Sequence, residues 1–300
     1  MRTLACIAMG VVAASSLMPS AAAAQQPTVH VLEGGPTTVA WGYYWSEAPP
    51  VLRIESGDIV EMSTFLTSSP DRLERAGIPP EQVEPALRAV YAEVTERGPG
   101  GYIREACEGV GMKIVWLDRE QNTAEFLPGV TVPLAPFFGS MGVAPPSDAG
   151  RWSSVPPWIH AGNIDNKEMV AGTTLFIPVH VAGALFEAGD GHAAQGDGEV
   201  DQTGIETSLR GRFQLIVRKD MSIEWPRGET PTHHIAMGSD EDLAEATRIA
   251  IQQAIALLGD VYDIAPRDAY QLISVACDLR ITQLVDRKVG VHVMIPKSLF

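Results

Sequence analysis

Cationic side chains are scarce in this sequence. Its 300 residues include 22 Lys or Arg against 37 Asp or Glu, which gives a formal net charge of −15 at pH 7. A surface this acidic repels the phosphates of nucleic acids and of anionic lipids. We therefore expect neither a nucleic acid nor a membrane among its partners.

Long apolar runs are absent except at the start of the chain. Residues 1–24, MRTLACIAMGVVAASSLMPSAAAA, combine Arg2, an apolar stretch and an Ala-rich end that suits A-x-A cleavage. This pattern predicts a cleaved signal peptide and a periplasmic or secreted protein. Cys6 lies too early to follow a full apolar region, which argues against lipoprotein cleavage. Loss of Arg2 would bring the formal charge to about −16.

Cysteine is also scarce, with three in the chain. Cleavage of the signal would leave Cys107 and Cys277, which permits one disulfide and excludes a disulfide-rich scaffold. Cys277 lies in LISVACDLRI, an apolar pattern of helical spacing. The favoured interpretation of this residue is a buried, unreactive thiol.

Two common hydrolase signatures are missing. The chain has no H-E-x-x-H motif, and FFGSMGV around Ser140 lacks the G-x-S-x-G spacing of a nucleophile elbow. The sequence therefore gives no support to a zinc-protease helix or to a serine hydrolase of that kind.

The first half of the chain is dominated by strand and turn patterns. Alternating runs between Gln26 and Met62 predict strands, with SGD as a turn. A helix is predicted over 81–97, with Pro85 near its first turn. Short strands are expected over 112–132, and irregular surface or site-lining chain over 133–157. The apolar face of the predicted helix consists of Val83, Leu87, Val90, Tyr91 and Val94.

The second half mixes strands with two helices. TTLFIPVHVAGALFEAGD predicts strand, turn and strand, and LRGRFQLIVRK and VGVHVMIP predict further strands. Ser239 is expected to cap a helix over 240–258 that ends before Gly259, and a second helix is expected over 266–276. The expected fold is α+β and β-rich, with β-sandwich or barrel-like layers and a C-terminal α/β portion.

The stretch GDGHAAQGDGEV, residues 189–200, gathers polar side chains between glycines that let the backbone bend sharply. His192 with Asp190 and Glu199 could bind a divalent metal such as zinc, although a polar turn remains the alternative. The spacing does not fit an EF-hand calcium loop. Because the stretch follows a predicted strand, its side chains could be aimed into a cleft.

Other polar residues give weaker signals. HAGNIDNKE offers Asn163, Asp165 and Lys167, either as site residues or as an Asx-turn. His233 and His234, in ETPTHHIAMG, suit helix capping or packing as well as catalysis. Single histidines on strand patterns are best interpreted as satisfied core or surface residues, and they are His30, His180 and His292.

Several of these stretches occur together in one known family. PFFGSMGVAPP, HAGNIDNKE, GTTLFIPVHVAGALFEAGDGHAAQGDGEV, ETPTHHIAMG, DLRITQLVD and GVHVMIPKSLF stand in the order found in the acetamidase/formamidase family. VAWGYYWSEAPPVLRIESGDIV and ERGPGG fit it too, so the chain resembles this family over nearly all of 25–300. The resemblance implies one domain, with an N-terminal β part over about 25–135 and a remainder over about 136–300.

The resemblance implies hydrolysis of small linear amides to carboxylate and ammonia by a metal-activated water. The expected cofactor is a divalent metal, zinc first and calcium second, and the expected assembly is a homodimer. The metal ligands would be Asp165, Asp190 and His192, and the general base Glu199, with Asp197 and Lys167 as further catalytic residues. The residues expected to contact the substrate are Asn163, Gln195 and His233.

One departure from the family concerns the stretch after Gly101. Relatives carry a further segment of a few tens of residues where this chain reads GPGGYIREACEGVGMKIV. That segment includes a His where this chain has Tyr102 or Ile103. The alternative to an amidase is therefore a non-catalytic periplasmic binding or structural protein that retains the family scaffold.

Overall fold

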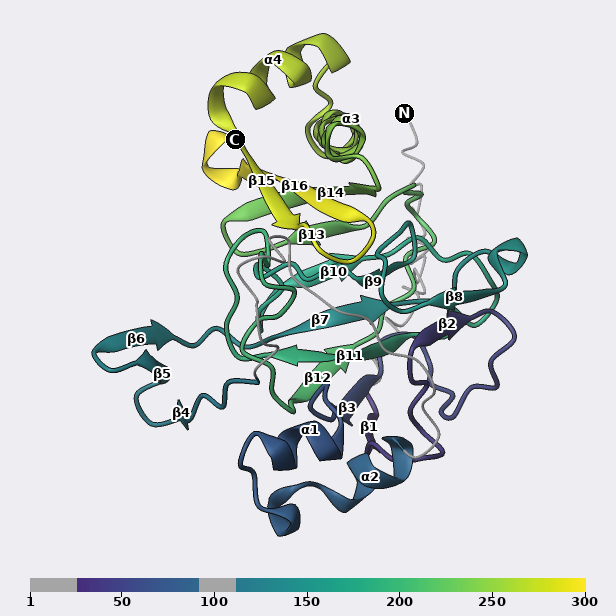
Figure 1. Ribbon diagram of the computed structural model, residues 1–300. Coiled ribbons are helices and arrows are strands. Elements are labelled where there is room, and N and C mark those ends of the chain that lie inside the picture. Colours follow the sequence, from purple (N-terminus) through teal and green to yellow (C-terminus); the bar gives the residue numbers. More distant parts are fainter. Residues whose placement is uncertain (1–25, 92–111) are drawn as a thin grey trace, which may run out of the picture.

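The structure is a computed structural model that describes residues 26–91 and 112–300. The predicted signal peptide, Cys107 and most of the shortened stretch after Gly101 lie outside the described residues, as does the end of the helix predicted over 81–97. Figure 1 shows several small sheets joined by loops, with helices at the C-terminal end. The homodimer, secretion and the division at residue 135 stay predictions.

The N-terminal part combines one sheet with short helices. Strand β3 (Ile59–Ser63) pairs in parallel with β1 (Val29–Leu32) and antiparallel with β12 (Arg210–Gln214). Helix α1 (Pro70–Arg75), the 3-10 turn η1 (Pro80–Gln82) and α2 (Pro85–Tyr91) follow β3. The predicted helix thus begins later than expected. Val83 is extended, and proline suits the first helical turn because it has no N–H to donate.

A three-stranded sheet occupies the middle of the molecule. Strand β7 (Phe137–Gly142) lies between β11 (Glu187–His192) and β9 (Ala161–Asn163). Every residue of β7 is buried in a regular strand, so of the two alternatives expected over 133–157, irregular surface chain was wrong for these residues. Its glycines weaken the strand pattern, but Phe138 and Met141 pack into the core.

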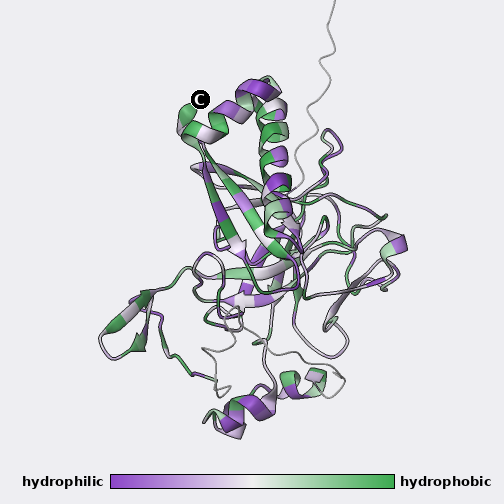
Figure 2. Ribbon diagram, turned by 45° about the horizontal axis from the view of Figure 1, so that its top comes forward, coloured by the Kyte–Doolittle hydropathy of each residue, from purple (hydrophilic) through white to green (hydrophobic). Residues whose placement is uncertain are grey.

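The C-terminal part is a five-stranded sheet covered by helices. The strand order is β10 (Thr174–Phe176), β13 (Arg227–Glu229), β14 (His233–Asp240), β16 (Val289–Pro296) and β15 (Asp278–Gln283). Helix α3 (Leu243–Tyr262) packs on β14 and β16, and α4 (Pro266–Ala276) packs on α3 (Figure 1). Figure 2 shows hydrophilic and hydrophobic bands alternating along these helices, as expected when one helical face is buried.

Both ends of α3 differ from the prediction. Ser239 belongs to β14, and Asp242 caps the helix by accepting a hydrogen bond from the Glu245 N–H. At the other end, α3 continues through Gly259 to Tyr262, where Asp263 takes a left-handed conformation with φ of 54°. Helix α4 ends at Ala276 as expected, so the helical pattern LISVACDLRI holds only up to that residue. Cys277 follows α4 and leads into β15, where it is half-buried, and burial raises the pKa of its thiol.

Smaller elements complete the fold. Strand β2 (Tyr43–Trp45) pairs with β8 (Arg151–Ser153), while β4 (Leu117–Asp118), β5 (Thr123–Leu127) and β6 (Val130–Pro133) form an arm that stands away from the body (Figure 1). Short 3-10 turns are η3 (Ser147–Ala149) and η4 (Lys297–Leu299). The strand-rich α and β mixture is confirmed. A sandwich is not confirmed, and neither is a barrel, since no sheet of the described residues closes. Among those residues, no helix has the length and apolar character needed to cross a membrane.

Candidate active site

Acidic side chains converge over Gly139 in the middle of β7. A Cβ atom at Gly139 would lie 2.3 Å from Asp165 Oδ1 and 3.1 Å from Asp190 Oδ2. The first contact would force the Asp165 carboxylate to move, and the second is tighter than most Cβ contacts. Glycine at this position therefore allows the two carboxylates to approach each other across the strand.

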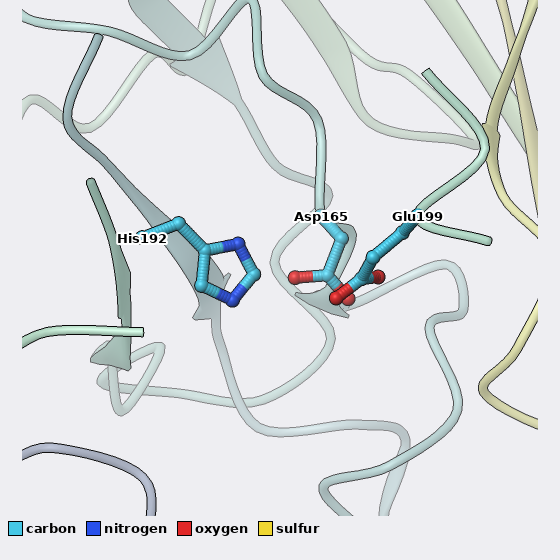
Figure 3. Close-up of side chains that lie close together, drawn as sticks. All are labelled: Asp165, His192 and Glu199. Atoms are coloured by element: carbon cyan, nitrogen blue, oxygen red, sulfur yellow. The ribbon is translucent and has the colours of Figure 1, made fainter. Parts of the chain in front are cut away.

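The most deeply buried part of the cluster consists of Asp165, His192 and Glu199. Asp165 follows β9, His192 ends β11, and Glu199 lies in the loop after β11, with exposed fractions of 1%, 0% and 6%. Figure 3 shows the three side chains pointing toward one another. One ligand atom from each lies within 4.8 Å of the other two. This spacing would suit a shared cation.

A second set of side chains shares His192. Its Nε2 lies 3.0 Å from Glu206 Oε1 and 3.8 Å from Asp190 Oδ2, and ligand atoms of these three residues also lie within 4.8 Å of one another. Glu206 faces His192 through an isolated β-bridge. Sequence analysis missed Glu206, because QTGIET carries no pattern that places it opposite His192.

Gln195 fixes the orientation and tautomer of His192. Its Nε2 donates to the Asp165 carbonyl oxygen at 2.7 Å, so its Oε1 faces His192 Nδ1, also at 2.7 Å. Because a carbonyl oxygen can only accept, Nδ1 must carry the hydrogen. In the neutral ring, Nε2 then carries no hydrogen, and its lone pair is directed at carboxylates. Gln195 was predicted to bind substrate, but both ends of its amide are already used within the protein.

Among the described residues, His192 is the one basic side chain beside the carboxylates of the cluster. Within the described residues, no Lys or Arg lies at ion-pair distance from any of them. Four polar atoms of the cluster are buried without a hydrogen-bond partner, and they are Asp165 Oδ1, His192 Nε2, Glu199 Oε2 and Glu206 Oε2. Unpaired buried charge is costly unless a counter-ion or a proton neutralises it. The donor set therefore fits a divalent cation.

The pKa values of the cluster show the same imbalance. Burial, aided by the charge on Glu199, raises the pKa of Asp165. Burial and the charge on Asp286 raise the pKa of Glu199 to about 9. Burial alone would lower the pKa of His192, but the nearby carboxylates of Asp190 and Glu206 outweigh it and raise that pKa to about 12. Without a cation, the cluster must hold protons instead.

Asp286 and Asn163 extend the cluster toward β15. Asn163 Nδ2 donates to Asp165 Oδ2 at 2.8 Å and to Asp286 Oδ2 at 3.1 Å. Burial raises the pKa of Asp286 to about 6. Asn163 was predicted to contact the substrate, but its amide nitrogen already makes these two contacts within the protein. Asp286 was missed, although it ends the stretch DLRITQLVD, which carried part of the family resemblance.

Three other predicted site residues lie outside the cluster. Lys167 Nζ lies 3.5 Å from Asp197 Oδ2 and 3.6 Å from Glu168 Oε1, so Lys167 and Asp197 belong to a partly exposed ion-pair network. His233 lies at the start of β14, where its backbone N–H donates to Thr230 and its ring contacts Thr232. The structure does not bring these side chains to His192.

The remaining histidines differ in whether their ring nitrogens have hydrogen-bond partners. His30 contacts Asp58 at 2.9 Å, and His292 contacts Thr282 at 2.8 Å through Nδ1. The expectation that these rings have hydrogen-bond partners therefore holds for His30. The Nε2 atoms of His180 and His292, in contrast, are buried without a hydrogen-bond partner. His160, not selected from the sequence, is fully buried with both ring nitrogens unpaired.

The backbone of the site is bent into unusual conformations. Asp165, Asp190 and Glu199 have φ angles of 45°, 56° and 43°. Such left-handed conformations are uncommon for residues other than glycine and cost on the order of 1–3 kcal/mol each. They persist here because the surrounding sheet and loops hold the chain in place.

The chain is similar to proteins named acetamidase or formamidase. The sequence profile of the Acetamidase/Formamidase family matches residues 148–300. An acetamidase of Mycolicibacterium smegmatis is 45% identical over 51 residues, which make up 17% of this chain and 13% of that protein. A formamidase of Methylophilus methylotrophus is 43% identical over 47 residues, 16% of this chain and 12% of that protein. The chain thus matches only a small part of these relatives.

Solved structures match over a much larger part of the chain. A predicted acetamidase/formamidase from Thermoanaerobacter tengcongensis has a TM-score of 0.75 and 21% identity, covering 91% of this chain and 97% of that one. An acetamidase from Bacillus halodurans has a TM-score of 0.73 and 22% identity, covering 89% and 98%. At this identity the similarity shows a shared fold.

Proposed function

Because the chain belongs to the acetamidase/formamidase family, we propose that it hydrolyses the C–N bond of small linear amides to carboxylate and ammonia. The observation that carries this proposal is the buried cluster around His192, whose unpaired nitrogen and oxygen atoms face one another. Amide hydrolysis needs a polarised carbonyl, an activated water and a proton for the leaving nitrogen. The cluster offers groups suited to each need.

We place a divalent cation, zinc first and calcium second, at His192 Nε2, with Asp165 and Asp190 as the carboxylates that the sequence identified. Glu199 forms one compact set with Asp165 and His192, and Glu206 forms another with Asp190 and His192. When bound, such a cation supplies Lewis acidity that polarises a carbonyl and lowers the pKa of water. Gln195 holds the His192 ring so that the Nε2 lone pair faces the carboxylates.

Proton transfer is assigned to Asp286. A general base works best when its pKa lies near the working pH, and burial raises the pKa of Asp286 to about 6. It is therefore ionised near neutral pH, can accept a proton from water and can return it to the leaving amine. Glu199, the general base of the sequence hypothesis, has a pKa raised to about 9 and an unpaired Oε2 facing His192, which favours a ligand role.

The test is ammonia release from formamide and acetamide by protein stripped with a chelator and then reloaded with Zn²⁺ or Ca²⁺. We expect release by the reloaded protein and little by the stripped protein. Asp220→Asn, which changes a surface carboxylate paired with Arg218, serves as the matched control and should retain activity. If the loaded wild type releases no ammonia from any small amide, the non-catalytic scaffold becomes the better description.

A further inference from the structure

The arm formed by β4, β5 and β6 ends in an apolar hairpin. Its tip reads FLPGV over residues 126–130, and residues 126–136 contain no charged side chain, in a chain with 37 Asp or Glu. Leu127 and Val130 have exposed fractions of 50% and 48%. Hairpin tips that face water are usually built from polar turn residues such as Asn and Asp. This composition favours a tip that contacts another apolar surface.

The arm packs against its own chain at its base. There Val132 and Leu134 join an apolar cluster with Ala193 and Ala194 of the body. Figure 1 shows β5 and β6 extending beyond this base, away from the other sheets, and Figure 2 shows hydrophobic residues along them. A sheet this small is only marginally stable in water unless its hydrophobic face is covered. The arm should therefore gain stability from a partner.

Strand β6 is an edge of the arm sheet that carries little protection against pairing. Within the described residues, Val130–Pro133 pair with β5, and their backbone groups have no hydrogen-bond partner outside the arm. Charged side chains and bulges discourage pairing at sheet edges. The edge strand β15 has both, namely Asp278, Arg280 and a bulge, whereas β6 has no charge and its one proline lies at its end.

A second copy of the same strand matches this edge. Two β6 strands that run antiparallel about Thr131 would place Val130 of each copy opposite Val132 of the other. Such cross-strand pairs of branched apolar side chains stabilise antiparallel sheets. The same arrangement places the two bodies, each with a formal charge of −15, at opposite ends of the paired arms. Their mutual repulsion is therefore weaker than in a direct contact between bodies.

We propose that the protein forms a two-fold homodimer in which β6 of one copy pairs antiparallel with β6 of the other. The two arm sheets then form one continuous sheet, and the tip of each arm contacts the base of the other, beside Ala193 and Ala194. Two short strands make a small contact, at the low end of interfaces of about 1,200 Å², so the dimer should be reversible, with a Kd on the order of 1–100 μM. This dimer does not depend on the proposed amidase function.

Sedimentation equilibrium over a concentration series tests the dimer. We expect a monomer–dimer equilibrium for the wild type. Val130→Lys puts a charge against an apolar surface and should weaken dimerisation at least about tenfold. Val275→Lys, at a valine of α4 with an exposed fraction of 82%, is the matched control outside the arm and should dimerise like the wild type. A wild type that stays monomeric at about 100 μM would overturn the proposal and assign the tip to a different partner. Equal dimerisation of the two lysine variants would also overturn it.

A cysteine at position 131 tests the register, because this residue lies opposite itself in the dimer. Directly opposite residues of antiparallel strands have Cα atoms about 4.5–5.5 Å apart, which a disulfide can span. Thr131→Cys, in a protein whose native cysteines are changed to serine, should form a covalent dimer on oxidation. Thr123→Cys, on the inner strand β5, is the matched control and should remain monomeric on a non-reducing gel. Circular dichroism verifies that both variants are folded. Folded Thr131→Cys protein that does not cross-link, or that cross-links no better than Thr123→Cys, would overturn the pairing of β6 strands.

Discussion

Gly139 is the residue on which the convergence of the cluster depends. In Gly139→Ala the new Cβ would lie 2.3 Å from Asp165 Oδ1, so the carboxylate must move. We expect cation affinity to fall at least about tenfold, as for other groups that position ligands. Gly189→Ala is the matched control on the neighbouring strand, because a Cβ there has no atom within 4 Å. Equal affinities for the two variants in equilibrium dialysis would contradict this role of Gly139.

Glu199 and Asp286 should respond differently to loss of charge. Asp286→Asn should lower kcat by about 10²–10⁴-fold while bound metal is retained, because the amide cannot accept a proton. Glu199→Gln should instead lose a cation. Steady-state ammonia release together with metal counting separates the two outcomes. If Glu199→Gln keeps its full metal content but loses turnover, Glu199 is the general base of the sequence hypothesis after all.

The sequence predicts some residues of this site better than others. Asp190, His192 and Glu199 were identifiable because one glycine-rich stretch concentrates them. Glu206 and Asp286 reach the cluster only through tertiary contacts, which local patterns do not encode. Lys167 and Asp197 were selected because they stand near site residues in the chain, but neighbours along an irregular loop point in different directions, and these two point into an ion-pair network.

At the scale of elements, the contact between β14 and α3 depends on small side chains. A Cβ at Gly238 would lie 2.6 Å from the Ala250 backbone nitrogen and 2.8 Å from the Ala246 carbonyl oxygen. Gly238→Ala should therefore lower the free energy of unfolding by about 1–3 kcal/mol, as overpacking does elsewhere. It should leave cation stoichiometry unchanged, because this contact lies on the helical side of the sheet.

Gly259→Ala is the opposite change within the same helix. A Cβ there has its nearest neighbour, the Ile264 carbonyl oxygen, at 3.6 Å. Alanine is favoured over glycine inside helices, so stability should rise by up to about 1 kcal/mol. Urea unfolding of both variants measures the contrast. A Gly238→Ala protein as stable as Gly259→Ala would show that the helix can move away from the sheet at little cost.

Element boundaries were harder to predict than element types. The two C-terminal helices were expected from apolar spacing, but Gly259 suggested an early end to α3. Tertiary packing overrides that local preference, since Leu257, Leu258 and Tyr262 contact the sheet or the core around it. Strand β7 was not predicted, because its sequence has a weak local preference for a strand. Its core position allows two glycines and a serine where an isolated strand would favour branched side chains.

At the scale of the whole molecule, two buried neutral imidazoles make stability depend on pH. Burial lowers the pKa of His160 to about 4 and, with the charge on Arg280, that of His292 to about 3. Between these values and the unfolded value of about 6.5, the unfolded chain binds protons that the folded chain does not. The free energy of unfolding therefore falls as the pH drops through this range, and each of the two histidines contributes to the loss.

The expected size of this effect is on the order of 1–2 kcal/mol per histidine between pH 7.5 and pH 5. His160→Leu removes one titrating group, so its free energy of unfolding should depend less on pH than that of the wild type. His233→Gln, at a partly exposed position of β14, is the control and should follow the wild type. Urea titrations of metal-free protein at both pH values measure the difference, and parallel curves for His160→Leu and wild type would refute it.

The left-handed backbone at Asp165, Asp190 and Glu199 affects which substitutions selection would favour during evolution. Glycine adopts a φ of about 45–55° without steric cost. Glu199→Gly would relieve backbone strain and remove a buried carboxyl group whose Oε2 has no hydrogen-bond partner, so metal-free protein of this kind should melt at a higher temperature than the wild type. Scanning calorimetry of the two proteins measures this. Selection for heat tolerance alone would therefore remove the acidic side chains first, and their presence in a strained, crowded site indicates selection for what they bind.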